Sequence, residues 1–217
     1  MSDGSRAESK PSLSQSIGCF AELVAEGTPT PGGGSVSAYS GVLAASLGKM
    51  VCAITMSKPK YAAVEPRLSE MVGDLDNAAA RLRELIVEDS ASFEAVLNAY
   101  RLPKETEEQK SARTIAIQKA LHYAITVPLE TAERSLAVLI LVAELADIGT
   151  PNALSDVAVG VQLAQVAVKG ASYNVGINLS SIADREWADK IRDNLNSIIE
   201  QASTIAARVD EEMKAQR

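Results

Sequence analysis

The sequence predicts an all-α protein in which a single domain forms an up-and-down bundle of long helices. Hydrophobic residues make up 47% of the 217 residues but aromatic residues only 4%, so aliphatic side chains must fill the core. This composition suits closely packed helices better than a β-sandwich, which draws on aromatic and threonine side chains. No stretch alternates polar and apolar residues for long enough to predict a strand.

The first two predicted helices differ in character. A short helix over residues 14–27 carries apolar residues at helical spacing on one face and ends at a glycine. The second helix, residues 34–56, has an apolar length that approaches a membrane span. Lys49 near its middle, recurring serines and the lack of flanking aromatic residues favour a buried bundle helix. We therefore expect no membrane partner.

Four longer helices are predicted after Pro66. The first continues to about Tyr100 and is amphipathic, with aliphatic residues at helical spacing. After a break comes one long helix over residues 110–149, followed by a charge-poor helix over 153–183. The last helix, residues 185–216, is charged and amphipathic.

The two charge-poor helices, residues 34–56 and 153–183, predict a homodimer. A helix that is apolar all round has to be buried on all sides, and a bundle of this size has too few other helices to cover both. Ser37, Gly41 and Ala45 recur every fourth residue, a pattern that lets helix backbones approach closely. We expect two copies to share these small-residue faces.

The start of the chain and the cysteines bear on the compartment. Residues 1–14 are polar and have no apolar core of a signal peptide, so we interpret them as a disordered leader before a helical domain over residues 15–217. Cys19 and Cys52 lie far apart and form no paired-cysteine motif. Two thiols in a chain of this length are typical of a reduced, cytoplasmic protein.

Charge and histidine content exclude two classes of partner. The net charge is −7, with no block of like charges and no basic stripe, so nucleic acid is not an expected partner. One histidine, His122, and two separated cysteines give too few ligands for a common zinc site, and we expect no metal. An anionic small molecule remains compatible where basic groups gather locally.

Three consecutive glycines, Gly32, Gly33 and Gly34, lie between Pro31 and the second helix. No strand precedes them and the spacing is not that of a dinucleotide or phosphate-binding loop. A bare backbone at a helix N-terminus can meet a carboxylate or carbonyl oxygen, and glycine lets a flat ring approach closely. A tight turn with close helix packing explains the same residues equally well.

Polar residues follow the far end of the second helix and begin the fifth. Lys58, Lys60 and Tyr61 can clamp an anion or donate a proton, or the lysines can be solvated residues at a helix C-terminus. Ser155 and Asp156 fit helix capping and dipole compensation, with Asn152 as the N-cap. They fit proton transfer equally, because a lone carboxylate in an apolar helix can have a raised pKa.

Asn174 and Asn178 lie four residues apart and share one face of the fifth predicted helix. Two amides in an apolar helix need hydrogen-bond partners if they are buried, so they bond each other or a heterocycle. His122 is interpreted as structural, and no Ser–His–Asp or Cys–His arrangement can be assembled from the spacing.

Four stretches, taken together and in order, resemble the cyclodeaminase/cyclohydrolase family of folate enzymes. They are PTPGGGSVSAYSGVLAASLGKMV, SKPKY, DSASFEAVLNAYRLPK and PNALSDVAVG with the later YNVGIN. The likeness runs from about residue 12 to about residue 210 and is to the stand-alone form, without a formiminotransferase domain. Pro59 interrupts what is often a run of lysines, and Thr150 stands where an asparagine is common.

The resemblance implies a dimeric, all-helical enzyme that acts on a tetrahydrofolate derivative and has no tightly bound cofactor. It would either close 5-formiminotetrahydrofolate to 5,10-methenyltetrahydrofolate with release of ammonia, or hydrolyse the methenyl compound to 10-formyltetrahydrofolate. On this resemblance we expect Asp156, Lys60 and Tyr61 to be catalytic, with Asp156 as the first choice for proton transfer. The residues expected to bind the folate are Pro31, Gly32, Gly33, Gly34, Ser35, Ser155, Asn174 and Asn178. A non-catalytic folate-binding or helical interaction module on the same scaffold is the alternative.

Overall fold

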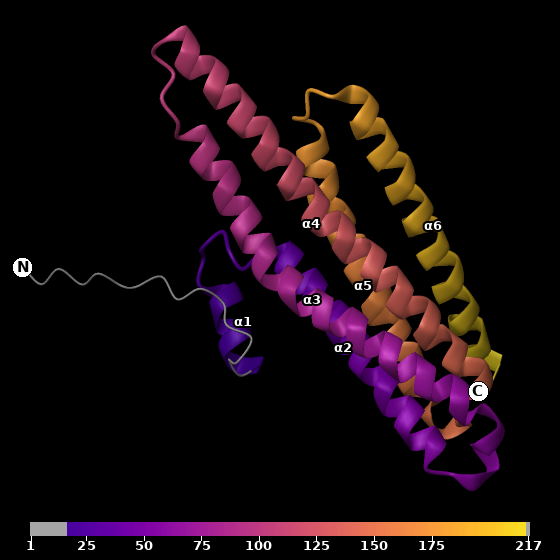
Figure 1. Cartoon of the computed structure of the whole chain (residues 1–217). Helices are drawn as coiled ribbons and strands as arrows, with labels where there is room; N and C mark the ends of the chain where they lie inside the picture. Colours follow the sequence, from indigo (N-terminus) through magenta and orange to yellow (C-terminus); the bar gives the residue numbers. More distant parts are fainter. Residues whose placement is uncertain (1–16, 216–217) are drawn as a thin grey trace, which may run out of the picture.

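The computed structural model describes residues 17–215, so the expected leader over residues 1–14 lies outside the described residues. Long helices run up and down beside one another, which confirms the all-α bundle (Figure 1). The α-helices are α1 (Ile17–Ala25), α2 (Gly33–Met56), α3 (Glu65–Tyr100), α4 (Glu107–Ile148), α5 (Leu154–Leu179) and α6 (Arg185–Ala215). Short 3₁₀ segments, η1 (Pro59–Val64) and η2 (Pro151–Ala153), precede α3 and α5.

Local sequence explains where the two longest helices begin. Pro66 lies in the first turn of α3. Backbone N–H groups there have no intrahelical acceptor, so a proline costs no hydrogen bond. The helix α4 begins three residues earlier than expected, because Thr106 and Gln109 form a capping box in which each side chain bonds the other's backbone amide. The α3–α4 hairpin that results extends well beyond the start of α2 (Figure 1).

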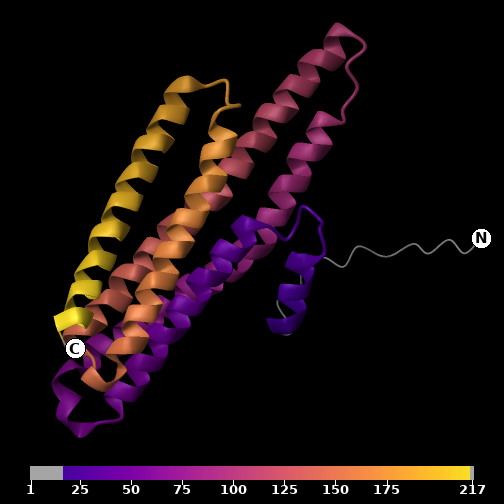
Figure 2. The same ribbon diagram turned by 180° about the vertical axis from the view of Figure 1, so that it is seen from behind.

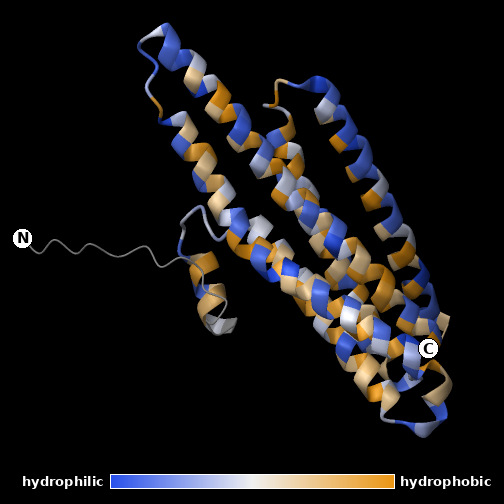
Figure 3. Cartoon of the chain, viewed as in Figure 1, coloured by the Kyte–Doolittle hydropathy of each residue, from blue (hydrophilic) through white to orange (hydrophobic). Residues whose placement is uncertain are grey.

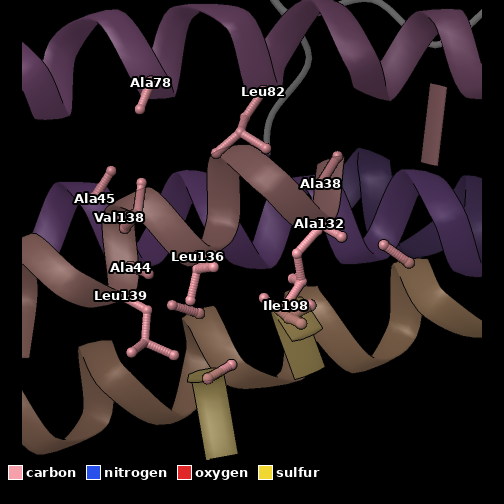
Figure 4. Packing of buried hydrophobic residues seen from close by; sticks show 14 of the residues in the cluster. Ala38, Ala44, Ala45, Ala78, Leu82, Ala132, Leu136, Val138, Leu139 and Ile198 are labelled. Atoms are coloured by element: carbon pink, nitrogen blue, oxygen red, sulfur yellow. The ribbon is translucent and has the colours of Figure 1, made fainter. Parts of the chain in front are cut away.

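The core lies between α2, α3, α4 and α5 and is built from alanine, valine and leucine, as the composition predicted. Figure 4 shows Ala38, Ala44 and Ala45 of α2 among leucine and valine side chains of the neighbouring helices. The charged helix α6 covers α4 and α5 and carries alternating hydrophilic and hydrophobic patches along its length (Figure 3).

The small-residue face of α2 is used inside the chain. A Cβ atom on Gly41 would lie 2.9 Å from both a methyl group of Leu82 and the hydroxyl of Ser135, and one on Gly48 would lie 2.8 Å from Val142. These glycines let α2 approach α3 and α4 closely. This part of the small-residue face therefore packs inside the chain's own core, and dimerisation through small-residue helix faces stays a prediction.

Larger apolar side chains are exposed on α2 and α5 instead. The two helices lie side by side on the face opposite the one seen in Figure 1 (Figure 2). The exposed residues of this apolar stripe are Val36, Leu43, Met50, Ile54, Val159, Val166, Tyr173 and Ile177. Both charge-poor helices thus keep an uncovered apolar side, which was the reason to expect a dimer.

Among the described residues, α2 is the one helix long and apolar enough to cross a membrane by length and composition. In the bundle it packs against α3, α4 and α5, and 44% of its most apolar window is buried. This is the packing of a central bundle helix whose outer side faces away from the core.

Candidate active site

The residues selected from the sequence fall at opposite ends of α2. Helices α2 and α5 run antiparallel: Gly33 lies beside Asn174, and Gly160 lies beside Leu47. With a rise of 1.5 Å per residue, the 24 residues of α2 separate its two ends by about 35 Å. We call the Pro31–Ser35 turn with Asn174 the glycine end, and the Lys58–Tyr61 segment the lysine end.

At the glycine end, the start of α2 is capped by a carboxylate from another helix. The N-cap residue Gly32 offers no side chain, and the amide of Ser35 donates to Oδ2 of Asp89 in α3 at 2.8 Å. The Ser35 hydroxyl lies 2.9 Å from the same oxygen. A Cβ atom on Gly34 would lie 2.1 Å from Oδ1 of Asp89, so any larger residue there would force the Asp89 side chain to move.

Asp89 occupies the position that the sequence suggested for a carboxylate of the ligand. Its negative charge disfavours a second carboxylate at the same helix start. Burial raises the pKa of Asp89, and the hydrogen bonds from Ser35 oppose that rise only in part. Within residues 17–215 its carboxylate has no ion-pair partner, and its Oδ1 accepts no hydrogen bond.

The two asparagines of α5 bond to backbone carbonyls and not to each other's side chains. Asn174 Nδ2 donates to the carbonyl of Gly170 at 2.9 Å. Asn178 Nδ2 donates to the carbonyl of Asn174 at 3.0 Å and to that of Ala124 in α4 at 3.2 Å. Asn174 borders the glycine end, whereas both amide hydrogens of Asn178 are committed to the fold.

At the lysine end, Thr150 joins the loop before α5 to the end of α2. Thr150 is 3% exposed. Its amide donates to Oγ1 of Thr55 at 3.0 Å, and its own hydroxyl accepts from Nζ of Lys58 at 2.8 Å. Lys58, which the resemblance did not place among the catalytic residues, is therefore held in place by a side-chain hydrogen bond.

Tyr61 lies in the same cluster, and its pKa is below the usual value for tyrosine. A hydrogen bond with the Thr150 hydroxyl is the largest cause, and Lys60 and Lys58 add to it. The ammonium of Lys60 lies 4.8 Å from the centre of the Tyr61 ring. A phenol with a pKa lowered by a hydrogen bond and by nearby ammonium groups is suited to proton transfer.

Ser155 and Asp156 lie in the first turn of α5. Among the described residues, no ion pair joins the half-buried Asp156 carboxylate to a basic group. The N-cap of α5 is Ala153 and not Asn152, because residues 151–153 form the 3₁₀ segment η2. This turn follows directly from Thr150, which places it toward the lysine end.

Sequence reasoning missed Asp89 and gave no role to Thr150. The sequence did contain a signal for Asp89. It lies at helical spacing after Leu82 and Ile86, on the buried face of α3, where an acidic side chain is unusual. Nothing in the sequence indicated that Thr150 would lie against Lys58. In residues 17–215, no three His, Cys, Asp or Glu side chains group to hold a metal ion.

Comparison with known proteins gives the same family along nearly the whole chain. Residues 16–197 match the family described as formiminotransferase-cyclodeaminase. Methenyltetrahydrofolate cyclohydrolase of Methylorubrum extorquens is 35% identical over 93% of this chain and 97% of its own. Formimidoyltransferase-cyclodeaminase of Rattus norvegicus is 33% identical over 94% of this chain, which matches 38% of the rat protein.

A solved structure extends the likeness to the fold. The formiminotetrahydrofolate cyclodeaminase of Thermotoga maritima superposes with a TM-score of 0.84 at 29% identity, covering 93% of this chain and 97% of that one. Fold, length and sequence agree, and the chain belongs to the formiminotransferase-cyclodeaminase family.

Proposed function

We propose that this protein is an enzyme of folate one-carbon metabolism that makes or opens the methenyl bridge of 5,10-methenyltetrahydrofolate. The observation that carries the proposal is the family match over residues 16–197, with two relatives of nearly equal length named for reactions of this bridge. The alternative, a non-catalytic folate-binding module, would not require the hydrogen-bonded lysine, tyrosine and threonine of the lysine end.

Both candidate reactions need proton transfer at a one-carbon centre. In cyclodeamination, N10 attacks the formimino carbon, a proton is transferred to the departing nitrogen, and ammonia leaves. In hydrolysis, water adds to the methenyl carbon and loses one proton. The second proton of the water is transferred to N5 as the bond from the carbon to N5 breaks, which gives the 10-formyl product. Positioned acids and bases accelerate such steps by about 10²–10⁴-fold.

We assign these proton transfers to the lysine end. The lowered pKa of Tyr61 makes its phenol a better proton donor than that of an ordinary tyrosine. Asp156, with no ion pair among the described residues, is the candidate base, and Lys60 the candidate anion-binding group. Among the folate-binding candidates, Gly33, Gly34 and Asn174 keep this role, while Ser35 acts by holding Asp89.

An absorbance assay tests the function and its direction. Consumption of 5,10-methenyltetrahydrofolate by water indicates hydrolysis, and appearance of the same compound from 5-formiminotetrahydrofolate with release of ammonia indicates deamination. The relatives' names support both reactions, so each substrate is assayed separately. Failure to act on either substrate would refute the proposed enzyme and leave the folate-binding module, which calorimetric titration of the same folates would detect.

We also propose that the protein works as a homodimer. The support is the apolar stripe on α2 and α5, which remains uncovered in the single chain. Exposed apolar patches of this kind on a soluble protein mark interaction surfaces. Sedimentation equilibrium showing only a 22.9 kDa species at assay concentration would contradict the dimer.

A further inference from the structure

Three side chains at and beside the glycine end carry polar atoms that have no hydrogen-bond partner within residues 17–215. Oδ1 of Asp89 accepts no hydrogen bond. The Asn174 amide donates to Gly170 through its nitrogen, while its side-chain oxygen accepts nothing. The hydroxyl of Ser90, a residue that is 6% exposed, also lacks a partner. Buried polar groups in proteins are normally satisfied, so this cluster suits a ligand that supplies hydrogen-bond donors.

The carboxylate of Asp89 is held in place through one of its two oxygens. The amide of Ser35 donates to Oδ2 at 2.8 Å, and the Ser35 hydroxyl lies 2.9 Å from the same oxygen. A carboxylate has about four acceptor sites on its two oxygens. Both contacts are at Oδ2, so the acceptor sites of Oδ1 remain available to donors from outside the chain.

Ser90 belongs to the same corner of the fold. It lies one helical turn after Ile86, whose carbonyl is 3.0 Å from the Ser35 hydroxyl. Residues four apart share one side of a helix, so Ser90 lies on the side of α3 where Ile86 meets the start of α2. The buried hydroxyl is therefore a second polar group, besides the carboxylate, that the chain leaves unsatisfied at this corner.

The two glycines leave space around Oδ1. A Cβ atom on Gly34 would lie 2.1 Å from Oδ1, so the missing side chain keeps this oxygen unblocked. A Cβ atom on Gly33 would meet only the Asn174 side chain, at 3.9 Å. Phe93 lies four residues after Asp89 on the same side of α3 and is 39% exposed, which offers an aromatic group to a flat ligand.

We propose that the glycine end binds the pyrimidine edge of the folate's pterin ring, and that Oδ1 of Asp89 accepts from N3–H and the 2-amino group of that edge. This assignment rests on the proposed folate function and deepens it, because it gives the ligand a direction. The ring enters the glycine end, and the glutamate tail points away from it. Asp89 is then the residue that distinguishes a pterin from rings that lack these two neighbouring donors.

The glutamate tail and a metal ion fit the glycine end less well than the ring does. The carboxylates of the tail would be repelled by Asp89, which forms no ion pair with a basic side chain in the described part of the chain. A metal ion requires several ligands, and no three His, Cys, Asp or Glu side chains between residues 17 and 215 group to hold one. A neutral, flat group with donors on one edge matches both the charge and the open backbone.

Two folates that differ at one group test the contact with Asp89. Tetrahydrofolate carries the 2-amino group, whereas 2-deamino-2-oxotetrahydrofolate carries an oxygen in its place, which turns a donor into an acceptor. Hydrogen bonds to charged groups contribute strongly, so calorimetric titration of the wild-type protein should show about 10–100-fold tighter binding of tetrahydrofolate. Equal affinities would overturn the contact. This comparison needs no variant and stays decisive even if a substituted protein fails to fold.

Asp89→Asn should reverse the preference between the two folates. The oxygen of the new side chain can still accept from the Ser35 amide, while its nitrogen replaces Oδ1 and turns an acceptor into a donor. Binding of tetrahydrofolate should weaken by about 10–100-fold, and binding of the 2-oxo analogue should strengthen. Asp74→Asn, at an exposed position of the same helix, is the matched control and should keep the wild-type preference. If Asp89→Asn weakens both folates by the same factor, Asp89 only supports the start of α2 and the inference fails.

A side chain on Gly33 tests where the ring lies. Gly33→Val fills the open space beside Asn174 and should weaken tetrahydrofolate binding by about 10-fold or more. The matched control is Gly73→Val in α3, where a Cβ atom would also meet no crowding atom, and its affinity should be that of the wild type. A folded Gly33→Val protein with wild-type affinity would overturn the position of the ring.

Turnover separates a failure of this inference from a failure of the proposed function. A wild-type protein that converts one of the folates but shows no preference for the 2-amino group would refute the ring contact alone. A wild-type protein that prefers the 2-amino group but converts neither folate would refute the enzyme and leave the ring contact standing.

Discussion

The side-chain amide of Asn178 in α5 donates to the carbonyl oxygen of Ala124 in α4 at 3.2 Å. In an uninterrupted helix this carbonyl would accept from the amide of the residue four positions later, which is Pro128 and has no N–H. Asn178 therefore supplies the hydrogen bond that Pro128 withholds. The contact fastens α5 to the middle of α4 and explains a polar residue in an apolar helix.

This relationship predicts strong coupling between the two positions. Asn178→Ala in the wild-type background should lower the free energy of unfolding by about 1–3 kcal/mol, because it leaves a buried carbonyl without a donor. In a Pro128→Ala background the loss should be clearly smaller, since an alanine at that position provides the missing N–H. Urea unfolding of the four proteins gives the coupling energy. Additive effects would contradict the assigned role.

Gly34 and Gly33 should respond differently to the same substitution. Gly34→Ala places a Cβ atom 2.1 Å from the Asp89 carboxylate, which has to move, so we expect a loss of about 1–3 kcal/mol as in other overpacked sites. Gly33→Ala meets only Asn174, at 3.9 Å, and should change stability little. Thermal unfolding of both proteins measures the contrast. Equal midpoints would show that Asp89 does not hold the start of α2.

Asp156→Asn should lower kcat by about 10²–10⁴-fold if this carboxylate transfers protons. The thermal midpoint should change little, because asparagine keeps the shape of the side chain and its half-buried carboxylate forms no ion pair in residues 17–215. Asp193→Asn on the exposed side of α6 is the matched control for loss of one charge. Normal turnover of Asp156→Asn would transfer the role to Tyr61.

Thr150→Val should move the alkaline limb of the pH profile of kcat/KM to higher pH. The hydrogen bond with Thr150 is the largest cause of the lowered pKa of Tyr61, so its removal raises that pKa. Thr150→Ser retains a hydroxyl and should keep the wild-type profile. A pH series on the three proteins checks the sign. An unchanged limb in Thr150→Val would show that Tyr61 is not the group that titrates.

Arg81 should matter near neutral pH and much less in acid. Its guanidinium bonds Glu84 and Glu88 in α3 and Glu130 in α4. The hydrogen bond from Arg81 is the largest cause that holds the pKa of Glu130 below its usual value. A carboxylate with a lowered folded-state pKa adds stability above its unfolded pKa, and that stability is lost as pH falls through the folded value.

Arg81→Met should therefore lower the thermal midpoint at pH 7, and the difference from wild type should shrink as the pH falls below the ordinary glutamate pKa. Arg134 also contacts Glu130, and Tyr123 lies near Glu88. The same pH series on Arg134→Met therefore serves as a control, and the difference between the two variants gives the part of the pH-dependent stability that comes from Arg81. A difference independent of pH would mean that Arg81 acts through packing alone.

The sequence by itself determined the helices and the family. The apolar spacing in α3 and the glycines at the start of α2 are local signals, and local signals set where helices begin and which face they bury. The scarcity of aromatic residues predicted a core of small aliphatic side chains, which Ala38, Ala44 and Ala45 confirm. The ordered motifs were sufficient to predict the folate family.

Tertiary structure decided which residues act together. The carboxylate of Asp89 meets Ser35 across 54 residues, Lys58 meets Thr150 across 92, and Asn178 meets Ala124 across 54. Each pair depends on how two helices dock, which the period of one helix does not specify. The same docking turned the small face of α2 inward and left Leu43 outside. The bare backbone at Gly41 packs so closely against Leu82 that an added Cβ atom would lie 2.9 Å from a Leu82 methyl group.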